Sequence, residues 1–114
     1  MDDEIEIKEV VVSMQVDSDL EDIYDYSVDT FGERKAKEYV NYLYDTILTL
    51  DRNYLMYPQC RQLVTQGKIY RRIIAESHII IYRIARQVEV LRILHSASSN
   101  RKIRSTRTVK FFKN

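Results

Sequence analysis

The stretch "GKIYRRIIAESHIIIYRIARQVEVLRILHS", residues 67–96, decides the fold. It contains three segments rich in β-branched and aromatic residues, at 68–75, 78–85 and 88–95. Two-residue polar breaks separate them. Such runs are typical of strands, and breaks of this length are typical of hairpin turns. The sequence therefore predicts a three-stranded antiparallel meander.

The expected turns at 76–77 and 86–87 fix a register for this meander. In that register His78 lies directly opposite His95. A histidine at the end of a strand is more often a hydrogen-bonded polar tip than a ligand, and a histidine pair without carboxylates is a poor metal site. We therefore expect His95 mainly to end the core strand and to contact His78 or a backbone group.

The same register groups three arginines. Arg72 and Arg92 flank Ile81, and Arg83 lies diagonal to them. Guanidinium groups gathered on one sheet face repel each other and need anions, supplied either by acidic helices of the same chain or by a partner. Arg72, Arg83 and Arg92 are therefore the candidate partner-binding residues. Both sheet faces mix apolar and charged residues, so the pattern does not say which face the helices cover.

Helical patterns precede the meander. "EVVVSMQV", residues 9–16, predicts a first strand. Ser18 with Glu21, and Thr30 with Glu33, are spaced as capping boxes that would each begin a helix. Gly32 separates the two helices, and the second should end before Pro58. The expected class is α+β, in the order β-α-α-β-β-β, with an antiparallel sheet packed against a helical hairpin.

Charge divides the chain into two halves. Residues 1–60 carry fifteen acidic and five basic residues, a net of −10, whereas residues 61–114 carry thirteen basic and two acidic residues, a net of +11. A division of this size suggests that one half meets a charged partner. We expect one domain over residues 1–114, with a core at about 9–100 and a basic tail at 101–114. That tail is either solvated or docked through Phe111 and Phe112.

Composition narrows the class of protein. Cys60 is the only cysteine, so an intramolecular disulfide and a zinc site built on several cysteines are excluded. We expect no cofactor and no metal. The acidic start does not resemble a secretory signal, and no apolar run approaches the ~20 residues of a membrane helix. These features favour a cytoplasmic protein without membrane contact.

Two stretches resemble a known family. "DLEDIYDYSVDTFGERKAKEYVNYLYDTILTL", residues 19–50, is similar to the helical hairpin of ParE/RelE toxins of type II toxin–antitoxin systems. "YRRIIAESHIIIYRIARQVEVLRILH", residues 70–95, resembles the strands of the ParE branch. The resemblance implies a plasmid-stabilisation toxin that binds a cellular target such as DNA gyrase. It also implies a cognate antitoxin that neutralises the toxin.

The first alternative is a RelE-like, ribosome-dependent mRNA endoribonuclease. Such a site needs a group that activates the 2′-hydroxyl and cations that stabilise phosphorane charge. The candidates for these roles are His78, His95, Tyr82, Arg72 and Arg83. RelE relatives place arginines where this chain has Ile79 and residues 96–98, so we expect binding rather than catalysis. A second alternative is an inactive toxin homologue or a nucleic-acid-binding module.

Overall fold

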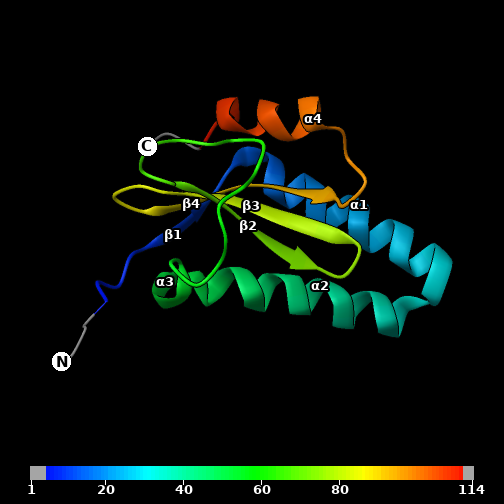
Figure 1. Cartoon of the computed structure of the whole chain (residues 1–114). Coiled ribbons are helices and arrows are strands. Elements are labelled where there is room, and N and C mark those ends of the chain that lie inside the picture. The colour runs from blue at the N-terminus through cyan, green and yellow to red at the C-terminus, as the bar shows by residue number, and fades with distance from the viewer. Residues whose placement is uncertain (1–4, 112–114) are drawn as a thin grey trace.

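A four-stranded mixed sheet forms the centre of the molecule in the computed structural model, which describes residues 5–111 (Figure 1). The strand order is β1-β4-β3-β2; β1 runs parallel to β4, and the other pairs are antiparallel. The expected α+β class and the meander are therefore confirmed, whereas the sheet as a whole is mixed and not antiparallel, because β1 runs parallel to β4. The strands are β1 (Val10–Val12), β2 (Tyr70–Ala75), β3 (His78–Ile84) and β4 (Val88–His95).

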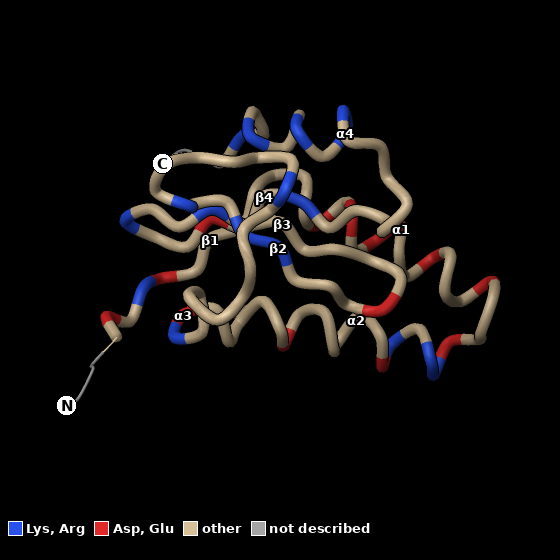
Figure 2. The backbone as a smooth tube through the Cα atoms, viewed as in Figure 1, with Lys and Arg blue, Asp and Glu red and all other residues tan. Residues whose placement is uncertain are grey.

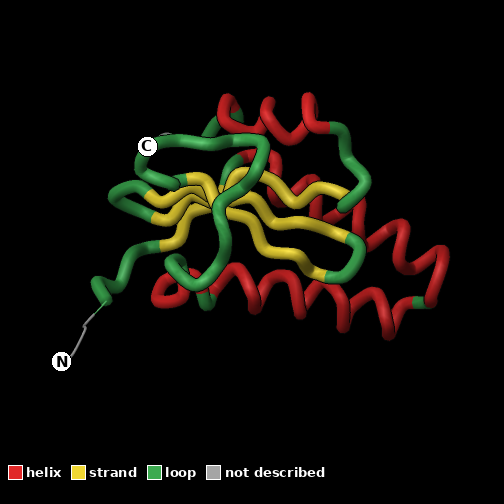
Figure 3. The backbone as a smooth tube through the Cα atoms, viewed as in Figure 1, coloured by secondary structure: helices red, strands yellow, loops and turns green. Residues whose placement is uncertain are grey.

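The helical hairpin packs against one face of this sheet (Figure 3). Its members are α1 (Met14–Phe31) and α2 (Glu33–Leu48), followed by the short α3 (Leu50–Asn53). Gly32 reverses the chain at φ +92°, a conformation that side chains disfavour. The capping box expected from Thr30 is wrong, because its hydroxyl donates to the Tyr26 carbonyl and Gly32 caps α2 without a side-chain bond.

Helix α1 begins earlier than the sequence pattern suggested. Its N-cap is Ser13, whose Oγ accepts from the backbone N–H of Gln15 at 3.2 Å. The predicted start at Ser18 is therefore wrong, and so is the extension of the first strand to Val16. Val16 is buried in the core from the first turn of the helix. The Ser18–Glu21 pair lies inside the helix, because Ser13 caps the helix five residues earlier.

The pairing of β3 with β4 contains two compensating deviations. The turn between them has three residues, 85–87, and not two. A bulge at Leu91 then adds one residue to β4, so His78 still lies opposite His95, as predicted. Between the turn and the bulge the register differs by one residue, so the side chains of residues 88–91 lie on the sheet face opposite to the predicted one. Val90 joins the core under the helical hairpin, and Leu91 faces the other side.

Both faces of the sheet bury apolar side chains, which explains why β3 is apolar almost throughout. The segment 60–63 and the C-terminal α4 (Asn100–Arg104) cover the face opposite the helical hairpin (Figure 1). The core under the hairpin includes Val16, Ile23, Leu43, Ile47, Ile73, Ile80, Tyr82, Val88, Val90 and Ile93. The second core comprises Cys60, Leu63, Ile79, Ile81, Leu91, Leu94 and Ile103.

The C-terminal segment is docked on the sheet. A 3-10 helix, η1 (Ser105–Thr108), follows α4 directly. Ile103 is 4% exposed, and Val109 and Phe111 pack against the second core. Phe112, the other aromatic residue of the tail, lies outside the described residues. Within residues 5–111, every helix is too short or too polar to cross a bilayer.

Candidate partner-binding site

The three sheet arginines share the face that α4 covers. Arg72 of β2 and Arg92 of β4 both lie opposite Ile81 of β3, as the sequence predicted. Arg83 follows Ile81 by two residues and so points to the same side of the sheet. Ile81 belongs to the second core, which places the arginines around that core rather than on an open surface.

Arg92 is held by an acid from α1. Its Nε and Nη2 both donate to the carboxylate of Asp19, at 2.8 Å each. Asp19 is only 8% exposed and also accepts from the Ile93 N–H at 2.9 Å, where β4 extends beyond β1. The hydrogen bonds to Asp19 raise the pKa of Arg92 and outweigh its burial. Arg92 therefore fastens α1 to the sheet. The sequence pattern gave no indication of this pairing.

Arg83 is also paired within the chain. Its Nε donates to Glu89 Oε1 of the neighbouring strand at 2.6 Å, and its Nη1 donates to the Tyr70 hydroxyl at 3.3 Å. The guanidinium carbon lies 5.7 Å from the centre of the Tyr70 ring. Both charged side chains of the pair are about one-fifth exposed. Arg83 can be reached by solvent, but its charge is already neutralised.

Arg72 differs from the other two. Among residues 5–111 it has no carboxylate within ion-pair distance, and its Nε is buried without a hydrogen-bond partner. A buried donor without a partner costs free energy that an anion could recover. Of the three sheet arginines, Arg72 is thus the one without an ion pair among residues 5–111.

A second group of cations lies on the C-terminal segment, outside the sheet. Their side chains are exposed, and in the part of the chain that the structure describes none of them forms an ion pair. Figure 2 shows this basic segment on one side of the molecule and the acidic α1 elsewhere. We call this group the basic cap. It consists of Arg101, Lys102, Arg104 and Arg107.

Tyr82 lies apart from the arginines. Its side chain is 0% exposed in the core under the helical hairpin, on the opposite sheet face from Arg72 and Arg83. Its hydroxyl donates to the Tyr54 carbonyl at 2.7 Å. Burial raises the pKa of Tyr82 well above its ordinary value. In this arrangement Tyr82 is a structural residue and is not positioned to act on RNA.

His95 ends β4, as expected. Its ring lies edge-on to that of His78 at 5.6 Å between centres, and its Nδ1 accepts from the Ala97 N–H at 3.0 Å. From His78 to Arg83 the chain runs five residues along β3, about 17 Å at ~3.3 Å per residue. The histidines therefore lie at the opposite end of the sheet from Arg83, and a cleavage site using both is not assembled.

Tyr39 is a site residue that the sequence did not reveal. Its hydroxyl lies 2.9 Å from the Ala75 carbonyl oxygen and 2.7 Å from His78 Nδ1. If the hydroxyl donates to the carbonyl, it accepts from Nδ1–H, which fixes the tautomer of His78. Burial, and then the neighbouring His95, lower the pKa of His78. The only sequence signal for Tyr39 was its place in the apolar stripe of α2.

Comparison with known proteins identifies the class. The structure resembles a chain of the chromosomal ParDE toxin–antitoxin system from P. aeruginosa, with a TM-score of 0.66 over 80% of this chain and 98% of that one, at 20% identity. The class of protein is thus an α+β domain with the fold found in that system.

The sequence narrows this class to a family. Residues 10–99 match the model described as ParE toxin of type II toxin-antitoxin system, parDE. Toxin ParE1 of Caulobacter vibrioides is 32% identical over 90 residues, which cover 79% of this chain and 91% of that protein. The chain therefore belongs to the ParE family of toxins of type II toxin–antitoxin systems.

Proposed function

We propose that this toxin acts by binding DNA gyrase in the cytoplasm and that it catalyses no cleavage. The match to the ParE family over residues 10–99 carries the proposal. The separation of Tyr82, His95 and the arginines supports it, because phosphoryl chemistry depends on cations placed at the reacting group.

The second part of the proposal concerns neutralisation. A cognate antitoxin binds the basic side of the toxin through an acidic segment, and the contacts are made by the basic cap and by Arg72. The support is electrostatic, since these cations lack carboxylate partners among residues 5–111, whereas Arg83 and Arg92 are paired internally. Exposed charges of this kind guide association and are sensitive to salt.

Induction of the toxin alone in a bacterium tests the first part. Plasmid supercoiling and mRNA integrity are measured in the same cells, with and without the co-expressed antitoxin. We expect loss of negative supercoiling with intact mRNA, and recovery with the antitoxin. Codon-dependent mRNA cleavage with normal supercoiling would instead identify a RelE-like ribonuclease and refute the proposal.

The binding surface is tested with a variant that carries glutamine at all four basic-cap positions. Its affinity for the antitoxin should fall, and more so at low salt than at high salt. A variant with glutamine at Arg34 and Lys37, exposed cations of α2, is the control and should bind normally. Equal affinities for all three proteins would exclude the basic cap as the contact.

A further inference from the structure

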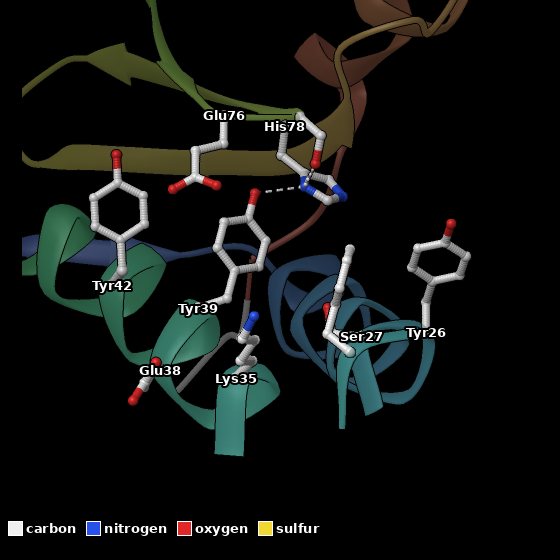
Figure 4. A pocket seen from close by; sticks show the side chains of 10 residues that line it. Tyr26, Ser27, Lys35, Glu38, Tyr39, Tyr42, Glu76 and His78 are labelled. Carbon is white, nitrogen blue, oxygen red and sulfur yellow. Dashed lines mark hydrogen bonds between the residues drawn. The ribbon is translucent and has the colours of Figure 1, made fainter. Parts of the chain in front are cut away.

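A cleft of about 470 Å³ opens between the tip of the helical hairpin and the turn that joins β2 to β3 (Figure 4). The tip of the helical hairpin, from α1 into α2, lies away from the basic cap on α4 and η1 (Figure 2). Aromatic and charged side chains line the cleft. Those that define its chemistry are Tyr26, Tyr39, Tyr42, Lys35, Glu38 and Glu76.

The walls of the cleft are aromatic and partly open to solvent. Tyr26 is 67% exposed and Tyr42 is 43% exposed, so both rings are accessible to a ligand. Tyr39 and Tyr42 stack with ring centres 6.2 Å apart and planes 29° apart. Tyr39 is held in place by its contacts with Ala75 and His78, so this wall is preorganised.

The charge inside the cleft favours a cation. Figure 4 shows the Glu76 carboxylate pointing toward the rings of Tyr39 and Tyr42. Glu76 holds a left-handed backbone, with φ +57°, at a turn position where glycine is preferred. Two carboxylates, Glu76 and Glu38, and one ammonium group, Lys35, line the cleft. Glu38 is already paired with Arg34 at 3.3 Å, so Glu76 is the carboxylate offered to a ligand. Helix α1, which forms one side, carries six acidic residues and no basic one.

We propose that this cleft binds the side chain of an arginine or lysine of the antitoxin. The cationic head lies against the faces of Tyr39 and Tyr42 and pairs with the Glu76 carboxylate. An aromatic face attracts a cation through its quadrupole, and a carboxylate at the same site adds directional hydrogen bonds. The antitoxin then complements both halves of the toxin, acidic toward the basic cap and basic at the cleft. The assignment of this cation to the antitoxin rests on the proposed function, whereas the cation site itself does not.

The cleft is tested first without any antitoxin. N-acetylarginine methylamide is titrated into the purified toxin and followed by NMR, with the neutral isostere N-acetylcitrulline methylamide as the matched ligand. We expect saturable shifts at the cleft from the arginine compound alone. Tyr42→Ala and Glu76→Gln should each weaken binding by about two- to fivefold, the size expected for one exposed cation–π contact or one charged partner.

Three further variants sharpen the test. Lys35→Gln should strengthen binding, because it removes the opposing charge. Glu76→Gly removes the carboxylate while relieving the left-handed strain, so weaker binding by this variant cannot arise from unfolding. Tyr44→Ala, an exposed tyrosine of α2 outside the cleft, should change nothing. Equal binding of the citrulline compound, or no saturable binding of either, would overturn the proposal.

The second arm uses the antitoxin itself. Glu76→Gln and Tyr42→Ala toxins should bind it at least about twofold more weakly than the wild type, and Glu21→Gln, an exposed acid outside the cleft, should not. If the wild-type toxin binds the arginine compound but the two variants bind the antitoxin as tightly as the wild type does, the antitoxin does not supply the cation. That result would overturn the assignment of the cation to the antitoxin. The gyrase assay tests the proposed function, and the titration with the arginine compound tests the cleft. Because the two experiments are independent, failure of one proposal can be told apart from failure of the other.

Discussion

The contact between Asp19 and Arg92 makes the sharpest prediction about stability. Asp19→Asn keeps the shape of the side chain and removes its charge. The carboxylate now receives two bonds from Arg92 and one from the Ile93 N–H. An asparagine presents one acceptor oxygen, and its amide hydrogens oppose the guanidinium donors.

The magnitude follows from burial. Breaking a fully buried ion pair costs about 3–5 kcal/mol, and breaking an exposed pair costs under about 1 kcal/mol. Asp19 is 8% exposed, but the Arg92 side chain is 22% exposed and can partly rehydrate. We therefore expect Asp19→Asn to lower the free energy of unfolding by about 2–3 kcal/mol. For a domain of this size the melting temperature should fall by roughly 8–12 °C.

Chemical denaturation of the wild type, Asp19→Asn, Arg92→Gln and the double variant provides the assay. The double-mutant cycle should give a coupling energy of at least about 1 kcal/mol, because the two side chains touch. Asp22→Asn, an exposed acid of the same helix, is the control and should be nearly neutral. A loss below about 0.5 kcal/mol for Asp19→Asn, or additive single changes, would refute the role of this pair.

Three other predictions follow from named side chains. The pKa of His78 is lowered from 6.5 in the folded chain, so on acidification below about pH 6.5 the unfolded chain takes up this proton before the folded chain does. The free energy of unfolding should therefore decrease as the pH falls through this range, and it should decrease less steeply in His78→Asn. Denaturant titrations between about pH 5 and 8 measure both slopes. Ile103→Ala should cost about 2–4 kcal/mol in thermal unfolding, because this residue anchors α4; a cost under about 1 kcal/mol would mean that α4 is loosely held. Glu76→Gly should stabilise the chain by about 0.5–1 kcal/mol in the same experiment, and a destabilised variant would contradict the inferred strain at this turn.

The sequence predicted those parts of the structure that depend on local pattern. The positions of β2, β3 and β4 and the reversal at Gly32 follow from periodicity and turn signals. The pairing of His78 with His95 was predicted from a two-residue turn and holds because the bulge compensates for the third turn residue. The bulge at Leu91 has no such signal, because Val90 and Leu91 are both apolar and each becomes buried in one of the two cores. When both faces of a sheet are buried, the apolar pattern of a strand does not show which side chains point to which face.

The candidate site was predictable only in part. The three arginines are grouped as the strand register required, but which acid pairs with which arginine depends on how α1 crosses the edge of β4. Asp19 looked like any other acid in the first turns of a helix. The cleft is harder to predict from sequence, because Tyr39 and Glu76 are brought together only when the helical hairpin packs against the sheet.

Binding without cleavage is tested most directly by assaying one preparation of purified toxin side by side on two substrates. The first is DNA gyrase with relaxed plasmid, and the second is programmed ribosomes with mRNA. We predict inhibition of supercoiling, relief by the antitoxin, and intact mRNA at the same toxin concentration. Reproducible codon-dependent cleavage on the ribosome with unimpaired gyrase, abolished by Arg72→Gln, would contradict the proposed mode of action.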